Sequence, residues 1–390
     1  MQKKNINSTI EQSRNTPKLR FNEFSGEWEK KELGEVFYNS KEKGNASLPI
    51  YSVTQKYGLI PRDSVERNIQ NDAAPGDNLV VNEDYLTYNM MRMWQGALGI
   101  AKVKCMVSPA YVVLKPSKIT NSSFFMYYFE KSRSLFLFKS YSHGLTLDRL
   151  RLYYDDFASI TFFIPSLHEQ QKIASFLTDV DEKLQALKKK KTLLEQYKKG
   201  VMQKIFSQEL RFKDDDGSDF PEWEVKKLGD CLDYIQPTKY LVESTEYDNS
   251  YSTPVLTAGK TFILGYTNET KGIFEDDLPV IIFDDFTTAT QFVDFPFKAK
   301  SSAMKILVAK EDVHIKFIYE TMNIMNYEIG GHERHWISKF ALLDILVPSI
   351  EEQSKIANFL SAIDQKIQLV QSQVEKMEVW KKGLLQKMFV

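Results

Sequence analysis

The sequence predicts a mixed α/β protein of the α+β type, in which two pseudo-repeated globular blocks are separated by two long antiparallel coiled-coil helices. Three observations lead to this fold class. A segment of 43 residues occurs twice, both copies have the apolar spacing of a long helix, and each follows a variable stretch of short apolar strands and polar turns. Residues 164–206 align without a gap to residues 347–389, with 19 positions identical, which indicates an internal duplication.

A second, shorter motif repeats upstream of each variable stretch. LRFNEFSGEWEKKELGE begins at Leu19, and LRFKDDDGSDFPEWEVKKLGD begins at Leu210 with a short insertion before its Trp. The chain therefore runs twice through a leading motif, a variable block and a helical segment. The predicted boundaries are 1–15 for a polar N-terminal segment, 16–163 for the first block, 164–206 for the central helix, 207–346 for the second block and 347–390 for the C-terminal helix.

Apolar residues recur at steps of three and four in both helical segments, which predicts a narrow stripe that pairs with another helix. Lys198 and its counterpart Lys381 interrupt the stripe. For one such helix, packing on its own domain is the simpler interpretation, but two copies of matched length favour antiparallel pairing. About 40 residues at 1.5 Å each give a rod of roughly 60 Å. The predicted seam residues are Ile173, Leu177, Val180, Leu184, Leu187, Ile356, Leu360, Ile363, Ile367 and Val370.

Each helical segment has a marked start. Pro165 is followed by Ser166, with Glu169 three residues further on, and Ser349 and Glu352 repeat this pattern. A Ser followed by Glu at this spacing predicts a capping box, in which each side chain binds the backbone N–H of the other residue.

Composition excludes several classes of protein. The 51 Lys and Arg residues nearly balance the 52 Asp and Glu residues, so any nucleic-acid surface must be local. Two distant cysteines and a polar N-terminus fit a reducing compartment, and no apolar run approaches the roughly 20 residues of a membrane helix. We therefore expect a cytoplasmic protein with no membrane partner.

The first block contains a strongly basic stretch. The stretch from Tyr85 to Arg151 contains ten Lys and Arg residues but only two acidic residues, Glu130 and Asp148, which gives a local net charge of +8. Cations interleaved with aromatic residues suit phosphate neutralisation combined with base-edge contacts, and Arg92 and Gln95 can each form bidentate contacts in the major groove. Individual residues such as Trp94 could instead belong to the core. The candidate DNA-binding residues are Gln55, Lys56, Tyr57, Arg92, Trp94, Gln95, Lys102, Lys139, Tyr141, His143 and Arg149.

The second block follows the same strand plan but is net acidic, and its stretch between the matching strands differs sharply from that of the first. One scaffold with two unlike faces is what two distinct recognition tasks need. Carboxylates near phosphates are usually repulsive, so the composition argument is weaker here. The candidate DNA-binding residues are Lys260, Thr287, Thr288, Thr290, Gln291, Lys298, Lys300, Ser302, Arg334 and His335.

No catalytic constellation emerges from the sequence. The AGKT stretch at Ala258 lacks the leading glycine of a P-loop, because Pro254 stands there, and no helix pattern follows it. His332 and His335 are three residues apart, whereas the zinc-protease pattern requires four. We therefore expect no catalytic residue, no metal site and no enzyme activity in this chain.

The duplicated starts PSLHEQQKIASFL and PSIEEQSKIANFL, with the helix ends QYKKGVMQKIF and VWKKGLLQKMF, resemble the specificity subunit of type I restriction-modification systems. The resemblance covers nearly the whole chain. It implies two target recognition domains that each read one half of a split double-stranded DNA site, with paired helices that fix the spacer and dock two methyltransferase subunits. It also implies that restriction subunits join the complex, and that S-adenosylmethionine, ATP and Mg are bound by partner subunits while this subunit binds no cofactor.

Two other functions remain possible from the residues. A stand-alone DNA-binding regulator would use the same blocks, with its coiled coil serving for homodimerisation, and an enzyme of the P-loop or nuclease class is disfavoured by the broken motifs. The sequence does not specify the DNA site, the spacer, the residues that touch bases, the presence of a restriction subunit or the stability without partners.

Overall fold

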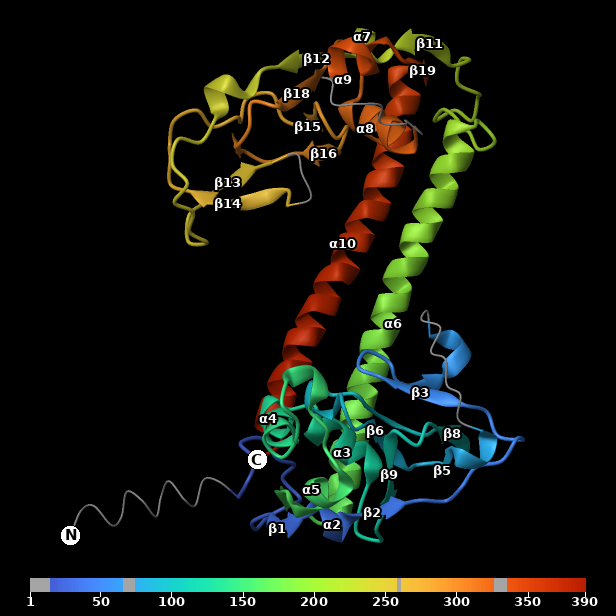
Figure 1. The fold of residues 1–390 in the computed structure, drawn as a ribbon. Coiled ribbons are helices and arrows are strands. Elements are labelled where there is room, and N and C mark those ends of the chain that lie inside the picture. The colour runs from blue at the N-terminus through green and yellow to red at the C-terminus, as the bar shows by residue number, and fades with distance from the viewer. Residues whose placement is uncertain (1–14, 66–73, 258–260, 326–334) are drawn as a thin grey trace, which may run out of the picture. The chain divides into compact units, whose positions relative to one another are not determined.

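The computed structural model describes residues 15–65, 74–257, 261–325 and 335–390 (Figure 1). The chain forms two compact units. Unit 1 contains residues 1–188 and 372–390, and unit 2 contains residues 189–371. Both units combine sheets with helices, so the predicted mixed fold class with two repeated blocks is confirmed. The predicted domain boundaries, which set each long helix apart, stay a prediction.

The central sheet of unit 1 has four strands in the order β2-β9-β6-β7, all antiparallel to their neighbours. Its apolar residues are buried because helices cover one face, while β3 and β4 form a hairpin that packs on β7. The strands are β1 (Glu29–Glu32), β2 (Phe37–Ser40), β3 (Tyr51–Thr54), β4 (Gly58–Pro61), β5 (Leu79–Val81), β6 (Leu86–Asn89), β7 (Leu98–Ile100), β8 (Cys105–Val107), β9 (Tyr111–Pro116) and β10 (Thr161–Ile164).

Unit 2 repeats this sheet as β12-β18-β15-β16, again antiparallel throughout. The strand pair that closes each block also repeats, as β1 with β10 in unit 1 and β11 with β19 in unit 2. Strands β9 and β18 occupy equivalent places in the two sheets. The strands of unit 2 are β11 (Glu224–Lys227), β12 (Leu232–Ile235), β13 (Thr253–Leu256), β14 (Ile263–Thr267), β15 (Val280–Asp284), β16 (Thr290–Val293), β17 (Lys298–Ala299), β18 (Met304–Ala309) and β19 (Asp344–Val347).

Short helices connect these strands, and two long helices belong to both units. The short α-helices are α2 (Leu33–Val36), α3 (Ser122–Phe129), α4 (Ser132–Ser140), α5 (Tyr154–Ser159), α7 (Leu228–Cys231), α8 (Ile315–Ile324) and α9 (His335–Ser338). The short 3-10 turns are η1 (Arg62–Ser64), η2 (Pro75–Asp77), η3 (Met93–Gln95), η4 (Leu147–Arg149), η5 (Pro237–Tyr240) and η6 (Phe340–Leu342). The long helices are α6 (Leu167–Phe206) and α10 (Ile350–Lys387).

In unit 1 the start of α6 pairs antiparallel with the end of α10. Asp181 forms an ion pair of 2.7 Å with Lys381, and Lys188 further along α6 pairs with Glu378 further back on α10. Toward the start of α6 and the end of α10, beyond the Asp181–Lys381 pair, Leu177, Val180 and Leu384 are buried in the core of unit 1. Lys381, which interrupts the apolar stripe in the sequence, therefore binds a carboxylate of the facing helix.

Unit 2 contains the duplicate of this contact. Lys198 lies 2.7 Å from Asp364 and 2.9 Å from Glu320 of α8, and Lys316 bridges the same two carboxylates. Burial alone would raise the pKa of Asp364, but the Lys198 and Lys316 ammonium groups outweigh burial, so this pKa is lowered. The same lysine position thus binds one carboxylate in unit 1 and two in unit 2.

Most of the predicted seam residues are buried, each within its own unit. Residues 173, 177 and 180 of the first copy share the core of unit 1 with the end of α10, and residues 356, 360, 363 and 367 of the second share the core of unit 2 with the end of α6. The buried residues are Ile173, Leu177, Val180, Leu184, Ile356, Leu360, Ile363 and Val370, and the half-buried ones are Leu187 and Ile367.

The last residue of each helical repeat is a Phe that packs in an aromatic cluster. In unit 1, Phe389 packs against Trp28 and Phe124 with ring centroids 6.5 and 5.2 Å apart. In unit 2, Phe206 packs against Trp223 and Phe317 with ring centroids 6.3 and 5.6 Å apart. Each long helix therefore starts beside one sheet and ends in the core of the other unit.

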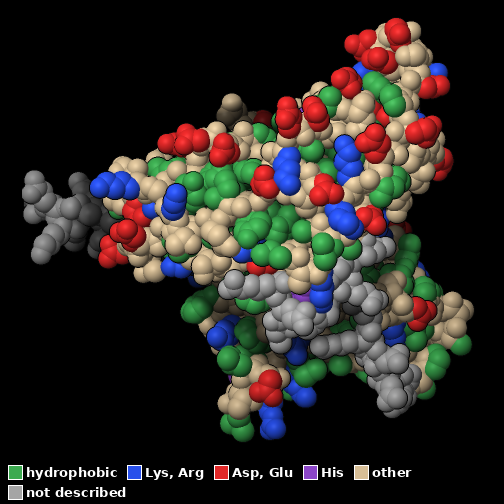
Figure 2. All heavy atoms as spheres, turned by 90° about the horizontal axis from the view of Figure 1, so that it is seen from above, with side chains coloured by type: hydrophobic (Ala, Val, Ile, Leu, Met, Phe, Trp, Pro, Cys, Tyr) green, Lys and Arg blue, Asp and Glu red, His purple; other side chains and the backbone are tan. Residues whose placement is uncertain are grey.

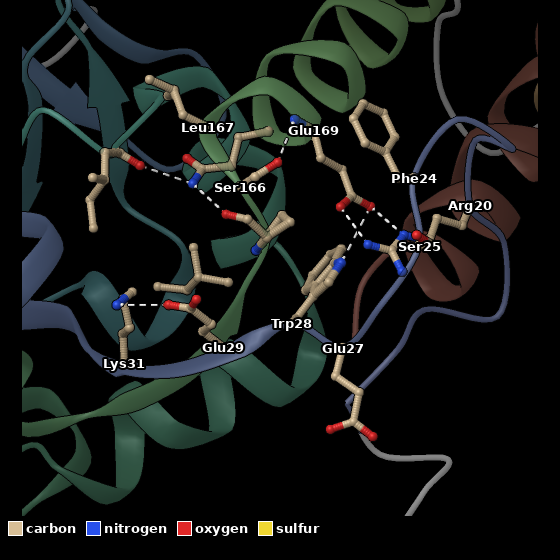
Figure 3. Close-up of a pocket in the computed structure, with 14 residues that line it drawn as sticks. Arg20, Phe24, Ser25, Glu27, Trp28, Glu29, Lys31, Ser166, Leu167 and Glu169 are labelled. Carbon is tan, nitrogen blue, oxygen red and sulfur yellow. Dashed lines mark hydrogen bonds and ion pairs between the residues drawn. The ribbon is translucent and has the colours of Figure 1, made fainter.

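The leading motif binds the start of the long helix through a buried carboxylate (Figure 3). In unit 1, Arg20 donates two hydrogen bonds of 2.7 Å to the Glu169 carboxylate, and the Trp28 indole N–H donates a third. The Glu169 side chain is 2% exposed. These groups line a pocket of about 340 Å³ at the base of the block. We call this arrangement the clamp of unit 1.

The clamp of unit 2 has the same composition. Arg211 donates to both oxygens of Glu352, and the Trp223 indole N–H donates to one of them at 3.0 Å. The repeated Arg and Trp of the leading motif are thus explained by one fully buried carboxylate at the helix start.

The predicted capping boxes form only in part. The Ser166 and Ser349 hydroxyls accept the backbone N–H of Glu169 and Glu352, at 3.3 and 3.4 Å. The two carboxylates do not return to the N-cap backbone, because the Arg and Trp donors of the clamp bind them instead.

Within the described ranges, no helix is both long and apolar enough to cross a membrane.

Candidate nucleic-acid interface

The turn between β6 and β7 presents the central candidate residues of unit 1. Met93 is fully buried beneath the turn, and Gly96 closes it with a positive φ of 85°, a conformation that favours glycine. The Arg92 guanidinium donates a hydrogen bond of 3.1 Å to the Gln95 side chain. The Trp94 indole N–H donates to the Met91 carbonyl. Arg92 is exposed while Gln95 is half-buried, so the turn holds both side chains in a defined arrangement.

Helix α4 and the loop that follows it brace this turn. The Lys139 ammonium lies 5.6 Å from the centre of the Trp94 ring, within range of a cation–π contact. The Leu152 N–H donates to the Met90 carbonyl at 2.9 Å, which fixes the end of the loop to the start of the turn. The structure therefore brings residues near 92 together with residues near 140, which lie far apart in the sequence.

The loop itself, residues 141–151, is closed at its base. The backbones of His143 and Arg151 exchange two hydrogen bonds of 2.9 Å, and the His143 ring contacts Asp156 at 3.0 Å. The predicted residues Tyr141, His143 and Arg149 all lie exposed on this loop. The pKa of Asp148 is lowered, chiefly by the hydrogen bond from the Thr146 side chain, with a smaller contribution from the charge of Arg92.

The tip of the β3–β4 hairpin lies near the same turn. Gln55, Lys56 and Tyr57 are exposed at the tip, and the Lys56 ammonium lies 4.9 Å from the Tyr57 ring centre. Gly58 has a positive φ of 64°, and a Cβ placed there would lie 3.5 Å from the Leu98 carbonyl at the start of β7. The hairpin tip thus approaches the end of β7 that leads out of the turn.

One predicted residue of unit 1 lies apart from this group. Lys102 is exposed beyond the opposite end of β7, where the Ala101 and Tyr85 backbones bond to each other. The length of the β6–β7 hairpin therefore separates Lys102 from Arg92, and Lys102 is not part of the cluster that the structure brings together.

In unit 2 the turn between β15 and β16 occupies the equivalent place in the sheet. The Asp284 carboxylate accepts the N–H groups of Phe286 and Thr287, and Thr288 has a positive φ of 59°. Thr287 is exposed, whereas Thr288, Thr290 and Gln291 are half-buried, and the Thr290 hydroxyl contacts the Asn323 side chain at 3.2 Å. This turn offers hydroxyl and amide groups in place of a cation.

Two predicted contacts of unit 2 are corrected by their burial. Lys298 is 3% exposed and is held 2.8 Å from Glu269, with a further hydrogen bond to the Lys271 carbonyl. His335 is fully buried, and its backbone N–H donates to the Asp285 carbonyl at 3.0 Å. Both side chains lie in the protein interior, Lys298 where β17 pairs with β13 and His335 next to the end of β15.

The remaining predicted residues of unit 2 are either on the surface or outside the described residues. Lys300 is half-buried, with its ammonium 5.9 Å from the Tyr247 ring centre, and Ser302 is exposed. Lys260 and Arg334 lie outside the described residues. Clusters of acidic side chains are visible on the face shown in Figure 2, in keeping with the net acidic composition of the second block.

One backbone hydrogen bond beside the candidate turn occurs in both blocks. The bond from Leu152 to Met90 in unit 1 and the bond from His335 to Asp285 in unit 2 join equivalent positions, since 152 and 335 differ by the offset of the repeat. Leu152 and His335 thus donate to the residue that directly follows β6 and β15, respectively.

The family model for the type I restriction modification DNA specificity domain matches residues 25–196 and again residues 221–378. Together the two matches cover more than half of the chain. The chain belongs to this family. Each match includes most of one block and most of one long helix, so the duplicated family domain is the duplication seen in the sequence. The clamp residues Arg20 and Arg211 lie just before the matched ranges.

Relatives in sequence are specificity subunits of the same kind, and a solved structure shares the fold. The chain is 50% identical to the Escherichia coli EcoR124I/EcoR124II specificity subunit over 139 residues, about a third (34%) of the length of each protein. It is 23% identical to the MjaVIII specificity subunit of Methanocaldococcus jannaschii over 407 residues, covering 92% of this chain and 91% of the relative. A crystal structure of a type I S subunit from M. genitalium shares the fold, with a TM-score of 0.65 at 16% identity over 96% of this chain and 99% of that one.

Sequence reasoning missed one feature of this family member's interface, the apolar side chains beside the basic cluster. Leu145 is 95% exposed, and Phe136 and Leu147 are also largely exposed. The leucines of the GLTLDRLR stretch fit neither a helix nor a strand period, and this misfit was the available signal. Among the residues that the structure describes, no group of three or more His, Cys, Asp or Glu side chains is placed to hold a metal ion.

Proposed function

We propose that the chain is the DNA-recognition subunit of a type I restriction-modification complex and reads a bipartite double-stranded site, one half with each block. The observation that carries this proposal is the repeated sheet whose equivalent turns bear unlike side chains. A scaffold used twice keeps the presentation of the turn constant, while a change of turn residues changes what is recognised. Membership of the DNA specificity family supports the same function.

The first block has the side chains for direct readout. Arg92 and Gln95 hold each other at 3.1 Å, and bidentate contacts of Arg with guanine and of Gln with adenine discriminate base pairs in the major groove. Lys139 and Arg149 beside the turn suit phosphates, which position a protein without carrying sequence information. The second block relies on Thr287, Gln291 and neighbouring polar groups, with fewer cations to neutralise phosphates.

The paired helices serve two roles in this proposal. A continuous helix of 40 residues is about 60 Å long, a scale that matches one to two turns of B-DNA, so the helices fix the spacer between the half-sites. Outside the seam the helices expose large apolar side chains, which mark protein interaction sites. The apolar side chains on α6 are Leu193 and Tyr197, and those on α10 are Leu369, Val379 and Trp380. We propose that two methyltransferase subunits dock there, one on each copy of the repeat.

Catalysis belongs to the partner subunits in this proposal. Methylation with S-adenosylmethionine, and cleavage driven by ATP with Mg, would be carried out by the methyltransferase and restriction subunits, while this chain contributes recognition and no cofactor. A complex that reads DNA in a prokaryotic cell works in the cytoplasm, which stays the expected compartment.

The proposal is tested by co-expressing the chain with the methyltransferase subunit from the same system and mapping modified bases across a host chromosome. The expected result is methylation at one split sequence, with two specified halves and a spacer of fixed length. A second strain carries a chain whose unit 2 turn, residues 285–289, is replaced by residues of another family member. Only one half of the methylated sequence should then change.

Two outcomes would contradict the proposal. Methylation that does not depend on this chain would remove its role in specificity. Purification of the chain as a homodimer that binds DNA without a methyltransferase partner would favour the stand-alone regulator.

A further inference from the structure

The loop of residues 141–151 in unit 1 places one apolar side chain almost wholly in solvent. Leu145 is 95% exposed, more than any other large apolar residue among those described. Burying such a side chain is favourable, and nothing in the described part of unit 1 covers it. Isolated exposed leucines are common on protein surfaces, so the backbone that holds Leu145 and the groups around it decide whether it has a role.

The loop is built to hold Leu145 in a fixed position. Two backbone hydrogen bonds join His143 to Arg151, and the Ser142 hydroxyl donates to the Phe138 carbonyl at 2.6 Å. A Cβ at Gly144 would lie 2.5 Å from the Arg149 carbonyl, so the two sides of the loop are in close contact next to Leu145. The backbone of Leu145 is therefore anchored on both sides, while its side chain extends into solvent and does not pack in the protein interior.

The surroundings of the loop fit a polyanion. The stretch from Tyr85 to Arg151 has a charge excess of +8, and Lys139, Arg149 and Arg151 are exposed around the loop. Its end is bonded to the start of the turn that carries Arg92 and Gln95. A leucine presented among these cations and base-reading side chains fits the groove of a DNA duplex better than a protein surface.

We propose that Leu145 recognises a thymine through its 5-methyl group, in the major groove of the half-site that unit 1 reads. This inference rests on the proposed function and adds a specificity-determining residue to it. The thymine methyl is the apolar group that the major groove displays, and apolar side chains contact it there. Insertion of an apolar wedge between base pairs is the other known use of leucine, but wedges act in the minor groove, whereas Arg92 and Gln95 suit the major groove.

The test measures binding of the full chain, as purified with its partner subunits, to duplexes of the mapped site. Each thymine of the unit 1 half-site is replaced in turn by deoxyuridine, which removes one methyl group and leaves base pairing unchanged. For the wild-type chain, one replacement should weaken binding about three- to fivefold, the factor expected for one buried methyl group. For Leu145→Ala, thymine and deoxyuridine at that position should bind equally.

The control variant is Leu342→Ala, which removes a leucine of similar chemistry, 57% exposed, from unit 2. It should keep the full response to deoxyuridine. Because Leu145 is outside the core, Leu145→Ala should fold as the wild-type chain does, and its affinity for the deoxyuridine duplex should match that of the wild type.

The outcomes separate this inference from the proposed function. A wild-type chain with no preference for any duplex would overturn the proposed function itself. Specific binding by the wild type with no thymine in that half-site, or with no response to any replacement, overturns only the role of Leu145. A uniform loss of affinity in Leu145→Ala, equal for thymine and deoxyuridine duplexes, would identify a wedge and also overturn it. Loss of the methyltransferase partner with unchanged DNA binding would show a protein contact instead, again overturning the inference.

Discussion

In unit 1 the turn between β6 and β7 carries Arg92 and Gln95, whereas the equivalent turn of unit 2 carries Thr287 and Thr288. The sheets beneath the two turns have the same strand order and the same pairing. The clamps at the base of the blocks also repeat, with an Arg and a Trp bound to one buried carboxylate. Duplication has therefore kept the groups that hold each block to its helix and altered those that face outward.

A smaller difference lies where the short helix of each block meets the long helices. In unit 1 the Tyr127 hydroxyl donates to Asp181 at 3.0 Å beside Lys381. In unit 2, α8 supplies Glu320 and Lys316 to the corresponding Lys–Asp pair. The two helix junctions thus share one ion pair and differ in the groups added to it, so the repeat tolerates change only around its conserved contacts.

The largest expected effect comes from shortening both long helices equally. Deletion of residues 184–190 and 367–373 removes one heptad from each helix and about 10 Å of helix length, the rise of three base pairs. We expect at least tenfold weaker binding to the original site, while the base preferences within each half stay the same. Affinities for duplexes with spacers of several lengths provide the measurement.

The repeat itself offers a control for the deletion. Replacing residues 184–190 with the sequence of residues 367–373 changes the same positions but keeps the helix length. This variant should bind the original spacing as the wild type does. Full affinity of the shortened chain for the original spacing would show that the helices do not set the spacer.

The largest expected loss of folding stability comes from breaking one clamp. Glu352→Ala leaves the Arg211 guanidinium and the Trp223 N–H without their buried acceptor, and we expect a loss of about 3–5 kcal/mol in the stability of unit 2. Amide hydrogen exchange resolved by peptide measures this loss unit by unit. Glu169→Ala should have the same effect on unit 1.

Glu222 provides a matched control, because it also pairs with Arg211, at 3.6 Å, but is 91% exposed. Glu222→Ala should cost less than about 1 kcal/mol, as exposed ion pairs do. Equal losses for Glu222→Ala and Glu352→Ala would mean that the clamp does not hold unit 2 together.

The sequence predicted the duplicated architecture because the repeated features are local and periodic. Apolar steps of three and four identified the seam, and burial of residues such as Leu177 and Leu360 follows from that spacing. The clamps were not predicted, since the pairing of Arg20 with Glu169 joins residues whose relation depends on the folded backbone. Glu169 was assigned to a local capping box because the sequence shows only neighbours along the chain.

The candidate interface was harder to predict for the same reason. A lysine in a basic or polar stretch is taken as a surface group, but Lys298 is buried because Glu269, far along the chain, comes to lie beside it. The local excess of cations drew attention to the segment around Arg92, whereas only the structure shows that Lys139 lies against Trp94. Charge counts locate a region, whereas burial decides which of its members are available.

The two helix junctions give a prediction of intermediate size. Lys198→Ala leaves the buried Glu320 and the half-buried Asp364 with one lysine between them, so unit 2 should lose about 3 kcal/mol. Lys381→Ala leaves Asp181 with the Tyr127 hydroxyl as a donor, and unit 1 should lose only about 1 kcal/mol. Hydrogen exchange of each unit measures the difference.

The junction of unit 2 also predicts a pH dependence. Because the pKa of Asp364 is lowered from its usual 3.8 in the folded chain, its contribution to stability is present above that value and is lost as pH falls through the lower folded pKa. The cost of Asp364→Asn should therefore be largest near neutral pH and shrink below about pH 4. A cost that stays constant down to pH 3 would argue against an ionised Asp364 in this junction.

The smallest effect concerns the readout turn of unit 1. Arg92→Ala removes the guanidinium that holds Gln95, and we expect weaker binding by about 1–3 kcal/mol with relaxed preference at one or two base pairs of one half-site. The half-site read by unit 2 should keep its preference. Binding to a set of duplexes with each base pair changed in turn measures both effects.

Lys102 supplies the matched control for Arg92, because it is exposed in the same block but lies at the opposite end of the β6–β7 hairpin. Lys102→Ala removes one positive charge, as Arg92→Ala does, so a purely electrostatic role would make the two variants alike. An equal loss of affinity for all duplexes in Arg92→Ala would identify a phosphate contact instead of a base contact. The turns of the two blocks would then differ in charge without differing in the bases they read.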